Sequence, residues 1–268
     1  MKIGIIGFGV VGKAAANTFE KAYDVVCYDK FLSLDSFDEI SKCDFTFIMV
    51  PTPFDVSENK VDDSAVMESL EKLAELSYSG IVIIKSTIPP GFTDLYSNNF
   101  DLEIVFNPEF LRESTSPMED FENQDIIVIG ASSEKTFLLV KKMYHKVTVP
   151  HAKFYHTTNK EAEMIKTAQN TMLASRVALA NMIYDACDKN NVDYQKVKEI
   201  AFDNFEILGT HMVQVPGPDG NRGFGGKCLP KDIRAFSTVH ESDLLTEIIN
   251  YNDSLRDDLD KFLMNYKD

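Results

Sequence analysis

The stretch that decides the fold is Lys2-Ile3-Gly4-Ile5-Ile6-Gly7-Phe8-Gly9-Val10-Val11-Gly12. Its first half is apolar enough for a buried strand, and its second half has the spacing Gly-x-Gly-x-x-Gly. Glycines at this spacing allow a tight turn into a helix and let backbone N–H groups reach a pyrophosphate. The sequence therefore predicts a dinucleotide site at Gly7, Gly9, Val10, Val11 and Gly12, although such a turn can also merely pack helix on sheet.

Asp29 ends the next predicted strand, seventeen residues after Gly12. A carboxylate at this position accepts hydrogen bonds from the adenosine ribose and repels a 2′-phosphate, so NAD is expected rather than NADP. Lys30, the next residue, has the opposite charge and works against this preference.

Alternating strands and helices continue to about residue 150, which is typical of βαβ units and a parallel sheet. Several strands are apolar on both faces, as expected when helices cover both sides of the sheet. The predicted strands are 2–6, 24–28, 45–50, 81–85, 103–106 and 126–129. The predicted helices are 10–21, 63–76 and 133–144, the last two with Asp62 and Ser132 as N-caps.

The pattern becomes helical from about residue 156. One stretch from Lys160 to Asn190 lacks Gly and Pro, and further helices are predicted at 193–201, 231–238 and 243–264. The sequence thus predicts an α/β protein, with a Rossmann-like doubly wound parallel sheet over 1–155 and an all-helical domain over 156–268. The long helix is apolar enough to pack against a second copy, so a homodimer is expected.

Composition excludes several classes of protein. The net charge of −15 over 268 residues argues against nucleic acid and anionic membranes as partners. No run of eighteen apolar residues is present, and the first residues resemble a strand rather than a secretory signal, so a cytoplasmic protein is expected. The four cysteines have no CxxC pair and no zinc-like spacing with histidine, so neither a disulfide framework nor a metal site is predicted.

The most informative loop is Gly223-Phe224-Gly225-Gly226-Lys227-Cys228-Leu229-Pro230-Lys231-Asp232. Cys228 is flanked by glycines, two lysines and the predicted start of a helix, and each of these features favours the reactive thiolate. An isolated cysteine is more often inert core, which fits Cys27 and Cys187. Asp232 lies one helical turn further on, where it can poise the thiol or a water molecule.

Three further segments carry polar groups. Lys166 and Asn170 share one face of the long helix, where charge and hydrogen bond can bind an oxyanion; two solvated polar residues are the alternative. The loops 85–91 and 107–114 follow strands at the carboxyl edge of the sheet, where cofactors bind. The second loop fits either a salt-bridged turn or acid–base chemistry.

Together these segments resemble the UDP-glucose/GDP-mannose dehydrogenase family. They occur in the family's order and span nearly the whole chain, and the loop Pro108 to Ser114 and the cysteine loop are far more specific than the glycine run. The matching segments are Gly7 to Gly12, Pro51-Thr52-Pro53, Ser86-Thr87, Pro108 to Ser114, Lys166 with Asn170, and Gly225 to Asp232. The resemblance implies oxidation of a nucleotide-sugar C6 alcohol to the carboxylate with two NAD⁺, UDP-glucose to UDP-glucuronate being the default.

The resemblance also implies roles for single residues. Cys228 would capture the aldehyde as a thiohemiacetal, which a second hydride transfer converts into a thioester that water hydrolyses. The implied catalytic residues are Cys228, Lys166, Asn170, Asp232, Thr87 and Glu113, the last as base for hydrolysis. Beyond the glycine turn, the implied cofactor contacts are Asp29, Pro51, Thr52, Thr87, Glu113 and Lys231. The implied substrate contacts are Glu109, Phe110, Leu111, Arg112, Glu113, Lys166, Asn170, Phe224 and Gly225, the last allowing close approach of substrate.

Two features depart from the family. Members typically continue into a second α/β domain that binds the nucleotide, whereas this chain stops at Asp268, so a short form lacking that domain is expected. The loop 213–222 is longer than in many relatives, and Arg222 is expected to replace some of the missing positive charge. UDP-glucose, UDP-N-acetylhexosamines and GDP-mannose all stay open as substrates.

Two other interpretations stay open. A β-hydroxyacid dehydrogenase of the 6-phosphogluconate type also joins a fingerprint domain to a helical domain and spaces Lys and Asn four apart. It performs a two-electron oxidation and needs no cysteine, so Cys228 favours the first interpretation. The third possibility is a non-catalytic NAD-binding fragment, or one that needs a partner.

Overall fold

The computed structural model describes residues 1–111 and 116–257, which form two compact units. Unit 1 comprises Met1–Thr52 and Asp62–Lys166, and unit 2 comprises Pro53–Val61 and Thr167–Asp268. The chain therefore passes from one unit to the other at three points.

Unit 1 is built on a seven-stranded sheet with the order β2-β1-β3-β6-β7-β8-β9. Its strands are β1 (Lys2–Ile6), β2 (Asp24–Tyr28), β3 (Phe45–Ile48), β6 (Ile81–Ile84), β7 (Glu103–Phe106), β8 (Ile126–Gly130) and β9 (Lys153–Thr157). All neighbours pair in parallel except β7 and β8, which are antiparallel. Because β1 lies between β2 and β3, the strand order reverses at β1, and α/β sheets bind ligands beyond the carboxyl ends of strands at such a reversal.

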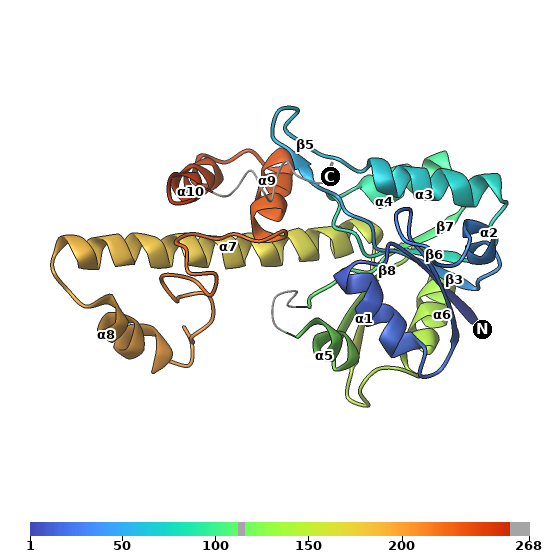
Figure 1. Cartoon of the computed structure of the whole chain (residues 1–268), viewed down its shortest axis with the longest axis horizontal. Helices are drawn as coiled ribbons and strands as arrows, with labels where there is room; N and C mark the ends of the chain where they lie inside the picture. Colours follow the sequence, from blue (N-terminus) through green and yellow to red (C-terminus); the bar gives the residue numbers. More distant parts are fainter. Residues whose placement is uncertain (112–115, 258–268) are drawn as a thin grey trace. The chain divides into compact units, whose positions relative to one another are not determined.

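Helices cover both faces of this sheet (Figure 1). One face carries α1 (Val10–Phe19), α5 (Pro117–Glu122) and α6 (Glu134–Tyr144), and the other carries α2 (Phe37–Ile40), α3 (Ser64–Glu75) and α4 (Phe92–Asn99). Alternation along β1 explains the division, since Ile3 and Ile5 enter the first core and Ile6 enters the second. Phe19 is fully buried in the first core, with its ring centroid 5.0 Å from that of Phe47 and 5.9 Å from that of Phe121.

Unit 2 is organised around α7 (Asn159–Lys189), a continuous helix of 31 residues that begins in unit 1. It also contains α8 (Tyr194–Lys198), the π-helix η1 (Glu199–Asp203), α9 (Leu229–Val239) and α10 (Asp243–Ser254). A short hairpin of β4 (Phe54–Asp55) and β5 (Lys60–Val61) belongs to this unit, because Phe54 and Val61 pack on Ala235 of α9.

The predicted fold class is confirmed, with differences in detail. The short hairpin of β4 and β5 joins the helical unit, and β7 and β8 form an antiparallel pair in the otherwise parallel sheet. Strand β9 was not predicted because most of its side chains are exposed and show no apolar alternation. The N-caps of α3 and α6 are Asp63 and Ser133, one residue later than expected, and the Ser133 hydroxyl accepts a hydrogen bond from the Thr136 N–H at 3.1 Å.

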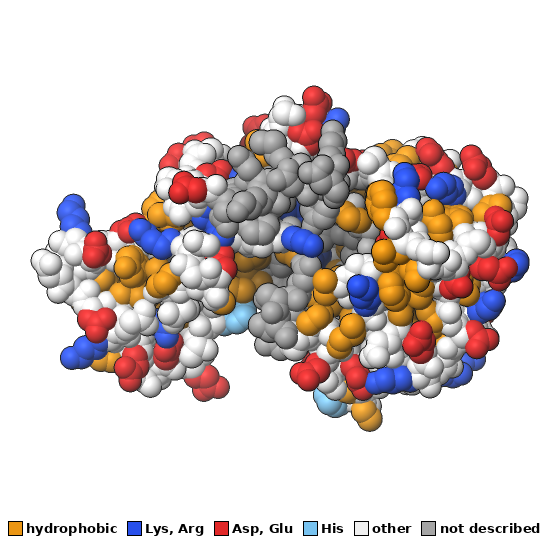
Figure 2. Space-filling view, in the orientation of Figure 1, with side chains coloured by type: hydrophobic (Ala, Val, Ile, Leu, Met, Phe, Trp, Pro, Cys, Tyr) orange, Lys and Arg blue, Asp and Glu red, His pale blue; other side chains and the backbone are white. Residues whose placement is uncertain are grey.

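Charged side chains of both signs lie on the surface, as expected from the composition. Figure 2 shows acidic and basic side chains interspersed over the face that it displays. Within the described ranges, none of the helices combines the length and the apolar character that crossing a membrane requires.

The contacts of Phe19 give a prediction for stability. Phe19→Ala removes a ring packed among four other rings, so the free energy of unfolding should fall by about 3–5 kcal/mol. Urea unfolding followed by circular dichroism measures this change. Phe31→Ala is the matched control, because Phe31 is 90% exposed; equal effects of the two substitutions would contradict the core assignment.

Candidate functional site

The glycine turn at the end of β1 is shaped partly by backbone contacts and partly by open space. Gly7 has φ +93°, and a Cβ on it would lie 2.5 Å from the Met49 carbonyl oxygen. A Cβ on Gly12 would lie 2.0 Å from the Gly7 carbonyl oxygen, whereas a Cβ on Gly9 would meet nothing within 4 Å. Gly7 and Gly12 are therefore required by packing, and the space beside Gly9, the N-cap of α1, fits a pyrophosphate.

Asp29 connects the loop after β1 to the loop after β2 by hydrogen bonds. Its carboxylate accepts hydrogen bonds from the N–H of Phe8 at 2.8 Å and from the N–H of Phe31 at 3.0 Å. Carboxylate oxygens have further lone pairs, so ribose hydroxyls can still donate to them. Lys30 forms an ion pair with Glu68 at 2.8 Å, so the charge that works against NAD is compensated.

The loops after β3 and β6 are joined by hydrogen bonds. The Thr52 hydroxyl donates to the Thr87 carbonyl at 2.7 Å, and the Ser86 hydroxyl donates to the Val50 carbonyl at 2.7 Å. The structure therefore brings Thr52 and Thr87 together, as two residues of one site require.

A buried lysine that the sequence analysis did not single out lies under the same edge. The side chain of Lys85 is 1% exposed, and its Nζ lies 3.0 Å from Oε2 of Glu109 and 2.9 Å from Oδ1 of Asn107. The Tyr144 hydroxyl donates to the same Asn107 oxygen at 2.6 Å. Burial lowers the pKa of Lys85, and the Glu109 carboxylate opposes this shift. A lysine directly after the apolar run Ile81–Ile84 was the available signal.

Glu109 and Lys166 organise the loop after β7. Oε1 of Glu109 accepts hydrogen bonds from the N–H of Phe110 at 2.9 Å and of Leu111 at 3.1 Å. Lys166 is 8% exposed, and its Nζ lies 5.6 Å from the centroid of the Phe110 ring. It forms no hydrogen bond or ion pair with the described part of the chain, so its ammonium can bind an anion. The predicted residues Arg112 and Glu113 lie outside the described residues.

Unit 2 holds the cysteine and its neighbours. Cys228 is exposed and is the N-cap of α9, and each of the four cysteines carries a thiol. Asp232 is fully buried; one carboxylate oxygen lies 2.8 Å from Lys231 Nζ, and the other accepts a hydrogen bond from the Asn170 amide. The structure thus brings Asn170, Lys231 and Asp232 together one turn after Cys228. Asn170 already donates to Asp232, which the sequence did not reveal.

Two predicted substrate contacts have structural reasons of their own. Phe224 is buried against the core of unit 2. A Cβ on Gly225 would lie 2.4 Å from an amino nitrogen of Arg256, so this position needs glycine even without a ligand.

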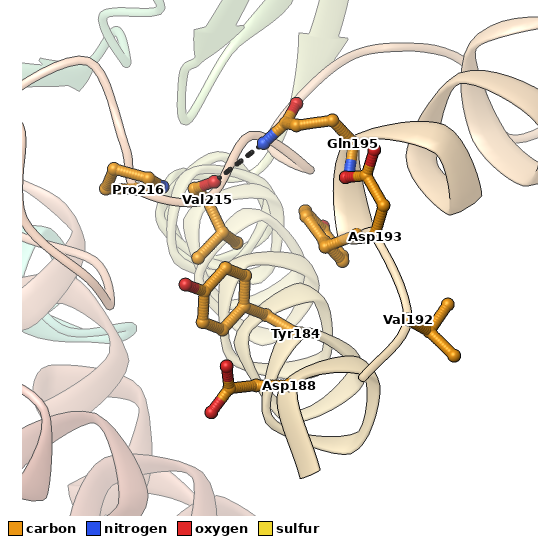
Figure 3. Close-up of a pocket in the computed structure, with 8 residues that line it drawn as sticks. Tyr184, Asp188, Val192, Asp193, Gln195, Val215 and Pro216 are labelled. Atoms are coloured by element: carbon orange, nitrogen blue, oxygen red, sulfur yellow. Dashed lines mark hydrogen bonds between the residues drawn. The ribbon is translucent and has the colours of Figure 1, made fainter. Parts of the chain in front are cut away.

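A separate pocket of about 310 Å³ lies elsewhere in unit 2. Figure 3 shows Tyr184 and Asp188 of α7 on one side, and Gln195, whose amide donates to the Val215 carbonyl at 3.0 Å, on the other. None of the predicted site residues lines this pocket.

The chain is similar in sequence to the UDP-glucose 6-dehydrogenases of two organisms. The UDP-glucose 6-dehydrogenase of Rickettsia bellii is 33% identical over 209 residues, which are 75% of this chain and 46% of the relative. That of Bacillus subtilis is 28% identical over 229 residues, covering 80% and 50%. The chain thus spans about half the length of these relatives.

Solved structures agree with the fold. A UDP-glucose dehydrogenase from Pyrobaculum islandicum superposes with a TM-score of 0.82 at 26% identity, over 94% of this chain and 68% of the other. A 3-hydroxyisobutyrate dehydrogenase from Mycobacterium tuberculosis gives a TM-score of 0.73 at 17% identity, over 97% and 95%, and this likeness concerns the fold alone.

Two family models account for most of the chain. The NAD binding domain of the UDP-glucose/GDP-mannose dehydrogenase family matches residues 30–148, and the family's central domain matches residues 160–254. The second match contains Lys166, Asn170, Cys228 and Asp232. The chain therefore belongs to the UDP-glucose/GDP-mannose dehydrogenase family.

Proposed function

We propose that this chain binds NAD and, through Cys228, oxidises the C6 alcohol of a nucleotide-sugar to a carboxylate, with UDP-glucose as the default substrate. The observation that carries the proposal is an exposed thiol at the N-terminus of α9, one turn before the buried Asp232. A helix N-terminus favours the thiolate, the nucleophilic form. The names of the relatives support the substrate class.

The NAD part of the proposal rests on unit 1. The open side of Gly9 fits the pyrophosphate and Asp29 fits the ribose, while Pro51, Thr52 and Thr87 border the same sheet edge. When bound, NAD⁺ supplies a two-electron acceptor that takes hydride from the sugar. The proposal assigns Lys231 and Glu113 to the cofactor as well, on the family resemblance alone.

Covalent capture is the role proposed for Cys228. After the first hydride leaves C6, the sulfur forms a C–S bond with the aldehyde carbon, and the carbonyl oxygen takes up the electron pair. Lys166 and Asn170, one turn apart on α7, are proposed to stabilise that oxygen by charge and hydrogen bond. The tether keeps a reactive aldehyde from diffusing away.

Hydrolysis completes the proposed reaction. Loss of a second hydride from the thiohemiacetal leaves a thioester, which water cleaves with release of the thiol. Asp232 and Thr87 are proposed to orient water, and Glu113 to take its proton. One alcohol and one water thus yield one carboxylate, two hydrides and three protons, which requires two NAD⁺.

The loop after β7 is proposed to hold the sugar diphosphate. Phe110 and Leu111 have their N–H groups turned inward to Glu109, which Lys85 holds in turn. This arrangement supports a role for 109–111 that depends on loop shape, with Glu109 acting as an anchor, while Arg112 is assigned to the substrate on the family resemblance alone.

A two-electron oxidation is the alternative. This is the reaction of a β-hydroxyacid dehydrogenase of the 6-phosphogluconate type, and the fold shared with 3-hydroxyisobutyrate dehydrogenase is compatible with it without indicating the reaction. A non-catalytic NAD-binding fragment, or one that acts only with a partner, is the other alternative, since the chain spans about half of its relatives.

Assembly and location also stay proposals. Exposed Ile165, Met172 and Leu179 recur every seven residues on α7, which supports packing of this helix against a second copy in a homodimer. Cytoplasmic location remains the expectation from the sequence.

The stoichiometry of NADH tests the reaction. With UDP-glucose, two NADH should form per sugar consumed, because the thioester pathway removes two hydrides. Cys228→Ser should abolish formation of the carboxylate while leaving the Kd for NAD⁺ unchanged. One NADH per sugar would refute the thioester pathway, and NAD⁺ binding without sugar-nucleotide binding at millimolar levels would favour the fragment. GDP-mannose and UDP-N-acetylhexosamines are assayed in parallel.

Cofactor preference depends on the charge of Asp29. Asp29→Asn keeps a hydrogen-bond acceptor but removes the repulsion of a 2′-phosphate, so the ratio of Kd for NADP⁺ to Kd for NAD⁺ should fall roughly tenfold. Calorimetry measures both constants. Lys30→Met is the control and should change the ratio little, because Lys30 is paired with Glu68; an unchanged ratio in Asp29→Asn would contradict the assignment.

The buried pair under the substrate loop gives a stability prediction. Lys85→Met leaves the Glu109 carboxylate without its cation and should cost about 3–5 kcal/mol of unfolding free energy. Lys85→Met/Glu109→Gln should cost less than the sum of the two single substitutions, as chemical denaturation can measure. Additive losses would mean that the pair is not coupled.

A further inference from the structure

Two asparagines fix the backbone that leads to Cys228. Oδ1 of Asn181, on α7, accepts a hydrogen bond from the Gly223 N–H at 3.1 Å. Asn252, on α10, accepts from the Phe224 N–H at 2.6 Å and donates to the Phe224 carbonyl at 3.1 Å. Both asparagines are buried, so these bonds replace contacts with water that the loop has lost.

A buried guanidinium lies against the next residue of the same loop. The Arg256 side chain is 0% exposed, and one amino nitrogen donates to the carbonyls of Arg222 at 3.3 Å and Gly223 at 3.4 Å. A Cβ on Gly225 would lie 2.4, 2.5 and 2.7 Å from three atoms of the guanidinium. Since the three distances are similar, the planar group faces the Gly225 position broadly.

The ion pair of Arg256 does not by itself account for this arrangement. Its partner Asp219, at 2.7 Å, has a side chain that is 44% exposed, and such a half-exposed pair contributes little. Burying a guanidinium is costly unless its donors are satisfied; one of its two amino nitrogens is bonded to the two loop carbonyls, and the other is bonded to Asp219. The position of the arginine is therefore explained better by its hydrogen bonds to the loop backbone than by its ion pair.

We propose that Arg256 is a positioning residue that sets the geometry of the Cys228 loop, and that Gly225 is glycine in order to seat its guanidinium. This deepens the proposed function, on which the role of Cys228 as nucleophile rests. Arg256 acts through the backbone of 222–225 and does not itself touch the substrate.

A double-mutant cycle on thiol reactivity tests the proposal. The rate of Cys228 alkylation by iodoacetamide is measured at pH 8 by mass spectrometry for wild type, Gly225→Ala, Arg256→Ala and the double variant. Burial raises the pKa of Cys27 and of Cys43 to about 11, so these thiols should react slowly at this pH. Gly225→Ala should change the Cys228 rate about fivefold in wild type, and less than about twofold where Arg256 is absent.

The same effect of Gly225→Ala in both backgrounds, or none in wild type, would overturn the proposal. Asp219→Asn is the matched control: it removes the ion pair but keeps an acceptor, and its rate should stay at the wild-type value. If Arg256→Ala does not fold, Arg256→Lys takes its place. The lysine side chain lacks the planar guanidinium, so it leaves room for the Cβ that Gly225→Ala introduces.

A second measurement separates this inference from the proposed function. In the sugar oxidation assay, Gly225→Ala should lower kcat about tenfold with the Kd for NAD⁺ unchanged, and Arg256→Ala should lower it similarly. If the wild type oxidises no nucleotide-sugar, the proposed function fails, while the alkylation cycle still decides the role of Arg256.

Discussion

The closeness of Gly12 to the Gly7 carbonyl is the constraint on which the sheet edge depends. Only a missing side chain lets the first turn of α1 press on the end of β1. With the turn fixed, the Phe8 N–H reaches Asp29 at the end of β2, so two loops hold each other before any ligand arrives. The same edge then collects Thr52, Thr87 and Glu109, each at the end of its own strand. Backbone packing comes first, and the chemistry is arranged around it.

Much of this fold was predictable, because the hydrophobic pattern of each segment and the residues that flank it indicate the same element. Strands β1, β2 and β7 have the predicted bounds, since each is a mostly apolar run that begins at one charged residue. The hairpin of β4 and β5 was not predictable, because two-residue strands are too short to show alternation. Strand β9 was missed for the opposite reason: it lies at the edge of the sheet, and exposed polar side chains hide its period.

The site was predictable as a set of residues but not as a set of contacts. Motifs pointed to Lys166, Asn170, Cys228 and Asp232, yet no spacing reveals that the Asn170 amide donates to Asp232. Lys85 was overlooked because a lysine after a strand usually reaches solvent, whereas this one is enclosed by Asn107, Glu109 and Phe121. Arg256 was not predicted because it donates to backbone carbonyls, and every residue has a backbone carbonyl, so no residue type indicates such a partner. Partners far apart along the chain become visible only in three dimensions.

The chain passes between the two units three times, so a single cut in the sequence cannot separate them into two complete units. A gene fragment that starts at Thr167 encodes most of unit 2 but omits Phe54 and Val61, which cover Ala235 on the helix that follows Cys228. Conversely, a fragment that ends at Lys166 carries that hairpin without the helix it packs on. Neither fragment therefore contains a complete unit. A recombination event that exchanges the chain at a single point between Lys166 and Thr167 would separate the hairpin from the helix, and apolar residues would become exposed on both fragments.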